Sequence, residues 1–155
     1  MADLASLLAE LGRRADLGEL SFDSDGTLSL RFDDRYDLTI ARDREGRALF
    51  LYGAVGQAGP ETGEAAWRRL LAATCLGAET GGAGLGVAED GLSLILWKRH
   101  DDGAFADYAD FENAVNQFLG HMIDFQERLP DLLLRDSEGG ITPPAMETSD
   151  LVIRV

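Results

Sequence analysis

Four residues near the start of the chain have the types and spacing of a calcium loop. Ser21, Asp23 and Asp25 would supply side-chain oxygens at alternate positions, and Gly26 follows where such a loop turns sharply. An EF-hand loop also needs a bidentate Glu at its twelfth position, and Phe32 stands there instead. The pattern therefore favours a glycine-containing turn over a calcium site.

A glycine-rich segment matches a nucleotide-binding loop only in part. Gly82, Gly84 and Gly86 are closely spaced, but the third glycine of the G-x-G-x-x-G fingerprint is missing. The segment is also predicted to lead from a helix into a strand, which reverses the order that places a phosphate at a helix N-terminus. Helix capping and a tight turn explain these glycines better, and we expect no nucleotide cofactor.

The remaining reactive side chains lack the spacing that catalysis or metal binding requires. His100, His121 and Cys75 have no close ligand spacing, so zinc is not expected. Ser93, His100 and Asp101 contain the residue types of a hydrolase triad, but no nucleophile-elbow motif supports it. We therefore predict no catalytic residue, no cofactor and no metal, and a protein that is not an enzyme.

Composition narrows the classes of partner. The chain has 155 residues, which fits one domain, and a formal net charge of -14. Its single lysine is Lys98 and its arginines are scattered among carboxylates, so a nucleic-acid partner is not expected. Residues 1–10 do not resemble a signal peptide, and no apolar run reaches the ~20 residues of a membrane span. We expect a cytoplasmic protein without membrane insertion.

The apolar pattern predicts three helices and five strands. Leucines at helical spacing predict a first helix over 2–15, and a second is expected to end at about Leu76 after a loop over 53–63. Alternating apolar residues predict strands near 28–32, 36–40, 47–55, 85–89 and 92–99. Two hairpins with helices between them indicate an α+β fold with an antiparallel sheet, in the order α-β-β-β-α-β-β-α.

The last helix has the clearest period in the sequence. Asp107 is its predicted N-cap and Pro130 its predicted stop. We interpret its apolar stripe as core rather than as a coiled-coil seam; the stripe comprises Tyr108, Phe111, Val115, Phe118, Met122, Phe125 and Leu129. The domain is predicted to span 1–135. Residues 136–155 are rich in glycine and proline and are predicted to form a loose tail, whose Leu151–Ile153 could alternatively dock as a short strand.

Apolar residues are expected on both faces of the sheet. Leu49 and Leu51 alternate with Phe50 and Tyr52, and the last strand repeats the pattern with Leu94 and Leu96 opposite Ile95 and Trp97. Such an excess marks a self-association or client-binding site in a soluble, highly charged protein. A two-layer core that buries all of it is an equal alternative.

An ordered set of short motifs carries a family resemblance. Residues 70–77 read L-L-A-A-T-C-L-G, residues 80–83 read T-G-G-A, and a hairpin follows. This order resembles the class I chaperones of type III secretion, the Tir-chaperone family, in which a helix reading A-A-N-(F/L)-(F/L)-G precedes T-G-G-A and a hairpin. Thr74 replaces the usual Asn, and in the last helix Phe125 replaces a Trp. The resemblance covers about two thirds of the chain.

The resemblance implies a homodimer that holds the N-terminal chaperone-binding segment of a secreted effector in an extended form, without nucleotide or metal. The implied dimer interface comprises Trp67, Leu71, Leu85 and Val87. An extended client can pair with a strand edge and place side chains beside a helix, so its predicted contacts lie on the first helix and the adjoining strands. These contacts are Leu4, Leu8, Leu11, Leu28, Leu30 and Phe32.

Three functions compete on this basis. The first is a bacterial secretion chaperone, and the second is a binding or regulatory module of the same fold without a role in secretion. The third is a small enzyme, which would need a convergent polar pocket that the sequence does not reveal.

Overall fold

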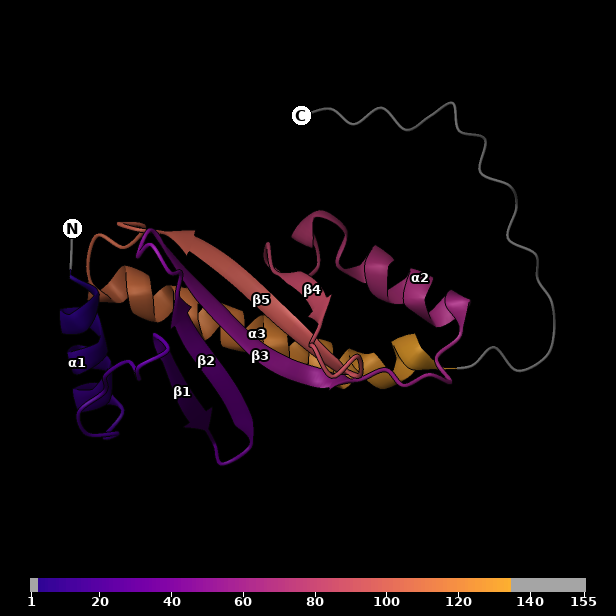
Figure 1. Cartoon of the computed structure of the whole chain (residues 1–155), viewed down its shortest axis with the longest axis horizontal. Coiled ribbons are helices and arrows are strands. Elements are labelled where there is room, and N and C mark those ends of the chain that lie inside the picture. Colours follow the sequence, from indigo (N-terminus) through magenta and orange to yellow (C-terminus); the bar gives the residue numbers. More distant parts are fainter. Residues whose placement is uncertain (1–2, 135–155) are drawn as a thin grey trace, which may run out of the picture.

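The computed structural model describes residues 3–134, which form a five-stranded sheet with helices (Figure 1). The predictions for the tail 136–155 and for Leu151–Ile153 lie outside these residues. The predicted α+β fold class and element order are confirmed. The elements are α1 (Leu4–Arg14), β1 (Thr27–Phe32), β2 (Tyr36–Arg42), β3 (Ala48–Gln57), α2 (Glu64–Ala73), the 3-10 turn η1 (Cys75–Gly77), β4 (Gly84–Val87), β5 (Ser93–Asp101) and α3 (Tyr108–Leu133).

The sheet has the strand order β1-β2-β3-β5-β4, and all neighbouring strands are antiparallel. The two predicted hairpins are β1-β2 and β4-β5, and the long strands β3 and β5 join them in the middle of the sheet. This order leaves β1 and β4 at the two edges, where one side of each backbone has no strand partner.

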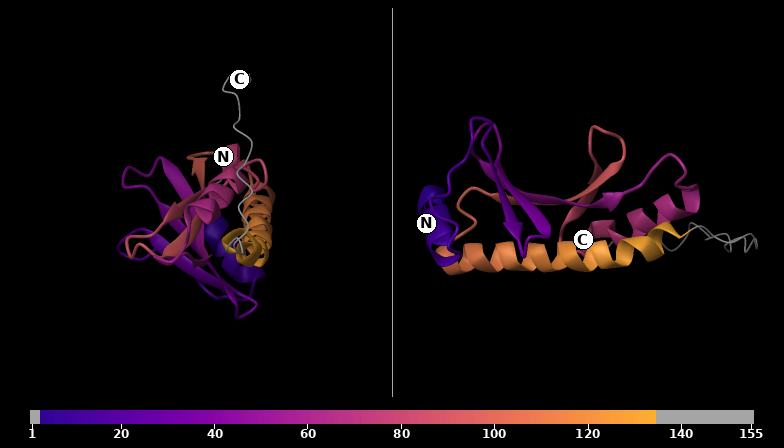
Figure 2. Two further views of the ribbon diagram at one scale, coloured as in Figure 1. Left: turned by 90° about the vertical axis from the view of Figure 1, so that its right-hand side faces the viewer. Right: turned by 90° about the horizontal axis from the view of Figure 1, so that it is seen from below.

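One face of the sheet carries the core. Leu49 and Leu51 of β3 are at most 5% exposed, whereas Phe50 and Tyr52, which alternate with them, are only half-buried. Figure 2 shows α3 running along the inner face of the sheet, with α1 at the beginning of α3 and α2 near its end. The second face of the sheet carries no helix (Figure 1).

Helix α3 has the predicted core role. Its buried side chains are those of the predicted stripe from Phe111 to Leu129, and the Asp107 carboxylate accepts a bond of 3.0 Å from the Asp110 N–H as an N-cap. The predicted stop at Pro130 is wrong, because α3 continues to Leu133. In the last turn the proline removes a single intrahelical donor, and the helix tolerates this loss.

The predicted loop start at Gly53 is also wrong, because β3 continues to Gln57. Gly53 and Gly56 serve the approach of α3 to the strand. A Cβ on Gly53 would lie 2.7 Å from the carbonyl oxygen of Asp37 and closer still to the Met122 sulfur. A Cβ on Gly56 would overlap a methyl group of Leu129. These glycines therefore remove bulk inside a strand and do not mark a turn.

The second helix is shorter than predicted. It ends at Ala73, and the turn η1 takes the chain from there into the T-G-G-A segment. Thr80 is 1% exposed, and its hydroxyl donates to the Ala83 carbonyl over 2.6 Å. The T-G-G-A segment is thus a closed turn that connects α2 to the edge strand β4.

Candidate functional site

The residues that could do chemistry do not converge. The Asp23 carboxylate accepts from the N–H groups of Asp25 and Thr27 at 3.0 and 2.8 Å, so it closes a turn. These bonds hold the pKa of Asp23 below its usual value. Within residues 3–134, no three His, Cys, Asp or Glu side chains gather as a metal-binding group.

The Ser-His-Asp combination considered from the sequence is not assembled. The Ser93 hydroxyl donates to Asp90 over 2.6 Å, and the Asp101 carboxylate accepts from Arg99. His100 instead packs against Phe105, with ring centroids 5.2 Å apart, and its Nε2 has no hydrogen-bond partner. Burial, together with the nearby Lys98 charge, lowers the pKa of His100.

The predicted client contacts divide into two groups. Leu8, Leu11 and Leu30 are 1%, 6% and 5% exposed and belong to the core, so little of their surface is open to a client, and their role as contacts stays a prediction. Periodicity places an apolar side chain on a face, but it does not show whether α1 and α3 already cover that face. Leu4, Leu28 and Phe32 are half-buried and still present apolar surface.

A pocket of about 210 Å³ opens beside Phe32, between α1, the end of β1 and α3. We call it the α1 groove. Its apolar wall includes Leu11, Phe32 and Val115, and its polar rim includes Arg14 and Glu112. The edge strand β1 borders it, so an extended segment could pair with the backbone and place side chains in the pocket.

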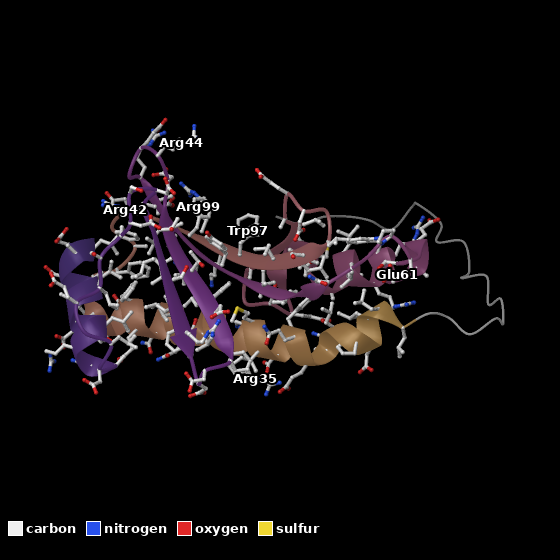
Figure 3. All side chains as sticks on the ribbon, turned by 60° about the horizontal axis from the view of Figure 1, so that its bottom comes forward. Arg35, Arg42, Arg44, Glu61, Trp97 and Arg99 are labelled. Atoms are coloured by element: carbon white, nitrogen blue, oxygen red, sulfur yellow. The ribbon has the colours of Figure 1, made fainter. Side chains whose placement is uncertain are left out.

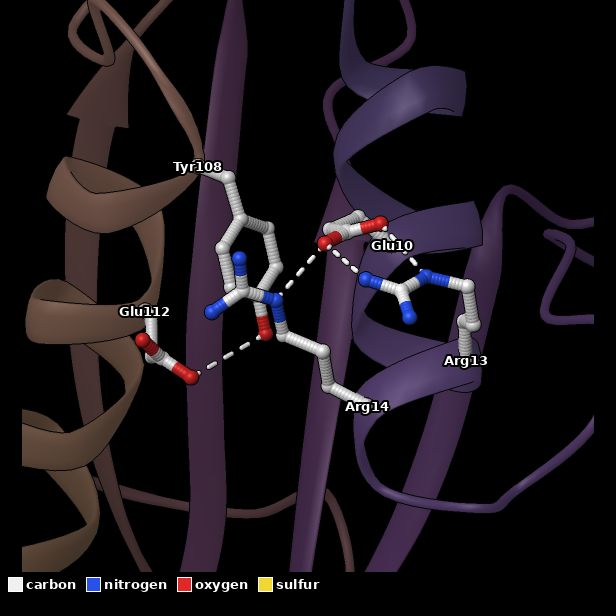
Figure 4. Close-up of polar contacts among 5 residues, drawn as sticks. All are labelled: Glu10, Arg13, Arg14, Tyr108 and Glu112. Carbon is white, nitrogen blue, oxygen red and sulfur yellow. Dashed lines mark hydrogen bonds and ion pairs between the residues drawn. The ribbon is translucent and has the colours of Figure 1, made fainter.

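A cluster of charged side chains fixes the rim of the α1 groove (Figure 4). The Glu10 carboxylate accepts hydrogen bonds from Arg13 and Arg14, and the shortest bond from each arginine is 2.6 Å long. These bonds hold the pKa of Glu10 at about 2. The Arg14 guanidinium lies 4.5 Å from the ring centroid of Tyr108. The Tyr108 hydroxyl donates to Glu112, one turn further along α3, over 3.3 Å, so it is the contact between Arg14 and the Tyr108 ring that joins α1 to α3. Sequence reasoning assigned Tyr108 to the core and did not find this rim.

The predicted self-association residues lie on α2 and β4. Leu71 is 63% and Val87 48% exposed, and Trp67 and Leu85 are half-buried. Leu76 in η1, which was not among the predicted interface residues, is 91% exposed. We call these five side chains the α2–β4 surface. Its role as an interface stays a prediction.

A third apolar area lies on the open face of the sheet. Trp97 of β5 is 41% exposed and is directed away from α3 (Figure 3). It pairs in register with Tyr52, and its ring centroid is 6.4 Å from that of Phe50. The predicted apolar residues on two faces of the sheet are therefore present, and helices cover one face.

Several solved structures have a fold similar to that of this chain. The ExsC–ExsE complex matches with a TM-score of 0.66 and 26% identity, over 83% of this chain and 97% of that chain. The heterodimeric ExoU–SpcU complex from the type III secretion system of Pseudomonas aeruginosa matches with a TM-score of 0.62 and 21% identity, over 84% of this chain and 98% of that chain. YbjN of E. coli, a putative transcription regulator, matches with a TM-score of 0.57 and 18% identity, over 86% of this chain and 93% of that chain.

No curated protein gives a sequence match. No helix within residues 3–134 is long and apolar enough to cross a membrane. The model of the Tir chaperone protein (CesT) family matches residues 6–126, a range from α1 through most of α3 that includes the α1 groove and the α2–β4 surface. This chain therefore belongs to the Tir chaperone protein (CesT) family.

Proposed function

We propose that this protein is a type III secretion chaperone, which binds the N-terminal chaperone-binding segment of an effector and keeps it soluble and competent for secretion. The match of the family model over residues 6–126 carries the proposal. It is supported by ExsC, which is 26% identical to this chain and was solved in a complex with ExsE. The chain would act by binding, in the bacterial cytoplasm, without catalysis, nucleotide or metal.

We place the client at the α1 groove and along the edge of β1. Phe32 supplies accessible apolar surface in the groove and Leu28 supplies it along β1, whose outer edge has unpaired backbone groups. Leu4, at the other end of α1, lines a separate pocket. Because these side chains are already half-buried, covering the rest of each contributes only about 1 kcal/mol, which offsets part of the cost of ordering a disordered segment. Main-chain bonds add affinity with little demand on the client's sequence.

We further propose that the working form is a homodimer joined at the α2–β4 surface. Leu71, Leu76 and Val87 expose a large part of their side chains to solvent in the isolated chain. A stable interface buries on the order of 800 Å² per subunit, which a helix and an adjoining edge strand can supply.

A regulatory module of the same fold is the alternative function. It is favoured by one observation, the similarity of fold to YbjN, a putative transcription regulator. Direct contact with nucleic acid is disfavoured for this chain by its net charge of -14. The module would therefore act by binding another protein.

Co-expression separates the two functions. The full chain is produced with the first ~100 residues of a secreted effector encoded beside it, a length that exceeds a typical docking segment. Size-exclusion chromatography with light scattering should then give one complex that contains the effector segment and two copies of the chaperone. The same effector without its N-terminal segment serves as the control and should elute separately. A chain that leaves the effector segment uncomplexed would contradict the secretion function and favour the alternative.

A further inference from the structure

Leu76 has a backbone conformation that its side chain does not favour. Four non-glycine residues between 3 and 134 have positive φ angles, and three of them, Asp16, Asp33 and Asp34, are aspartates. An aspartate tolerates the left-handed region because its short polar side chain can bond the local backbone. Leu76, with φ of 55° and ψ of 14°, has no such compensation.

Burial does not compensate Leu76 either, because its side chain is 91% exposed. Strained backbone persists where the surrounding structure determines it, and it concentrates at functional positions. A leucine that is both strained and exposed costs the isolated protomer stability and gives it no contact in return. An interaction outside the protomer would account for both features.

The turn that carries Leu76 is rigid. Gly77 follows it with a φ of 67°, and a Cβ on Gly77 would lie 2.8 Å from the Gly82 carbonyl carbon. The Gly82 N–H donates to the Gly77 carbonyl over 2.9 Å, and the buried Thr80 hydroxyl closes the following turn on Ala83. These contacts hold the leucine in its protruding position before any partner arrives.

The segment that carries Leu76 has few charged side chains of its own, and the Lys98 ammonium donates to the Gly81 carbonyl in the same turn over 2.6 Å. Residues 70–88 include one charged side chain, Glu79, in a chain of which 27% is charged. The Glu79 carboxylate is 2.7 Å from the Arg128 guanidinium, which offsets its charge. Two copies that each carry a net charge of -14 repel one another, and they can approach most readily through a surface without free carboxylates. Charge therefore favours a second copy of this chain at this surface.

The position in the fold separates this surface from the proposed client site. Tyr108 at the start of α3 contacts α1, whereas near the end of α3 the Leu132 carbonyl accepts from Arg69 of α2 over 3.0 Å. The turn after Leu76 meets α3 earlier, where the Glu79 carboxylate pairs with Arg128 and Gly81 lies against the His121 ring, so about 20–30 Å of helix separates this turn from Tyr108. A client in the α1 groove thus leaves Leu76 uncovered.

We propose that Leu76 is the anchor by which two copies of this chain associate, and that its left-handed backbone is strain kept for that contact. The inference rests on the proposed homodimer and adds to it the residue that dominates the interface. In a two-fold symmetric interface the same residue acts twice, once from each protomer. Leu71 and Val87 then provide the apolar surface around the anchor.

Two substitutions in the full chain test the two parts of this inference. Leu76→Ala and Leu76→Gly both remove the anchor, and each should raise the dimer Kd about 30-fold or more, measured by sedimentation equilibrium. They differ in strain, because glycine adopts the left-handed region freely. At dilutions where both variants are monomeric, the glycine variant should therefore unfold about 2–4 °C above the alanine variant. Leu17→Ala, at a leucine 42% exposed just beyond α1, is the matched control and should keep the wild-type Kd.

Each of the other possible outcomes would overturn a specific part of this inference. A wild-type Kd in both Leu76 variants would remove Leu76 as the anchor and leave the homodimer standing. A wild-type chain that is monomeric at micromolar concentration would overturn the homodimer and the anchor together. Loss of effector capture with an unchanged dimer would assign Leu76 to the client, and equal unfolding temperatures would refute the strain.

Discussion

Gly53 of β3 lies directly under Met122 of α3, and the hydrogen on its Cα faces the methionine sulfur where any other residue would carry a Cβ. A Cβ there would also lie 2.7 Å from the carbonyl oxygen of Asp37 on β2, which is backbone and cannot rotate away. The contact between the central strand and the long helix therefore depends on the absence of a side chain at this one position. This close approach of α3 to the sheet keeps the core between them tightly packed.

Gly53→Ala should destabilise the protein by about 1–3 kcal/mol, because the added methyl group must push α3 from the sheet. Urea unfolding at fixed protein concentration measures the change. Gly120→Ala is the matched control, since Gly120 lies in α3 with no neighbour near the added Cβ. It should stabilise the helix by up to about 1 kcal/mol. Equal effects of the two substitutions would contradict the close contact.

Thr80→Val should cost about 1–3 kcal/mol, because the buried Ala83 carbonyl loses its donor at nearly unchanged side-chain volume. The free energy of unfolding from urea titration gives the value. Thr39→Val is a suitable comparison, since the Thr39 hydroxyl shares a bond of 3.2 Å with Ser29 on the open sheet face. We expect that change to stay within about 0.5 kcal/mol.

The Glu10 cluster should make stability depend on acid pH. The pKa of Glu10 falls from 4.5 to about 2 in the folded chain, mainly through its bond from Arg13 and then that from Arg14. The folded state thus prefers the ionised form, so this contribution is complete above pH 4.5 and is lost as pH falls toward 2. Urea midpoints of the wild type and Glu10→Gln should differ at pH 6 and converge by about pH 2. A difference that is constant with pH would refute the linkage.

Phe32→Glu should weaken capture of the effector segment by about tenfold or more, because a carboxylate at the wall of the α1 groove would have to be desolvated. Affinity is measured by isothermal titration after circular dichroism has confirmed the fold. Leu92→Glu is the matched control, because Leu92 is 39% exposed in the turn between β4 and β5, outside the groove. Equal affinities of the two variants would move the client site elsewhere.

Treatment with EDTA, or addition of ATP, should leave the thermal midpoint unchanged within about 1 °C. A ligand that binds the native state alone raises its stability by mass action, so a required metal or nucleotide would reveal itself as a shift. Differential scanning calorimetry of the full chain measures this directly. A fall of several degrees in EDTA would contradict the expectation that no metal is bound.

The sequence by itself determined the elements whose information is local. The stripe from Phe111 to Leu129 repeats along one helix face, and the Asp107 side chain caps the same helix from three residues away. Alternation in β1 and β2 predicted both strands, and it restricts their pairing because a shift of one residue would turn Leu30 and Leu38 away from the core. The motif order from Leu70 to Ala83 also carried the family resemblance, which the family match confirms.

Only the tertiary structure decided which apolar residues remain accessible. Leu8 and Phe32 read alike in the sequence, yet α3 and the sheet bury the first and leave the second half open. From the sequence, Gly53 was predicted to begin a loop. The contact that requires a glycine there is made by Met122, which lies 69 residues further along the chain. Leu76 read as the end of a helix, and its exposed, left-handed state arises from a turn closed by Gly82. Burial and close approach depend on segments distant in sequence, and a local pattern carries no record of them.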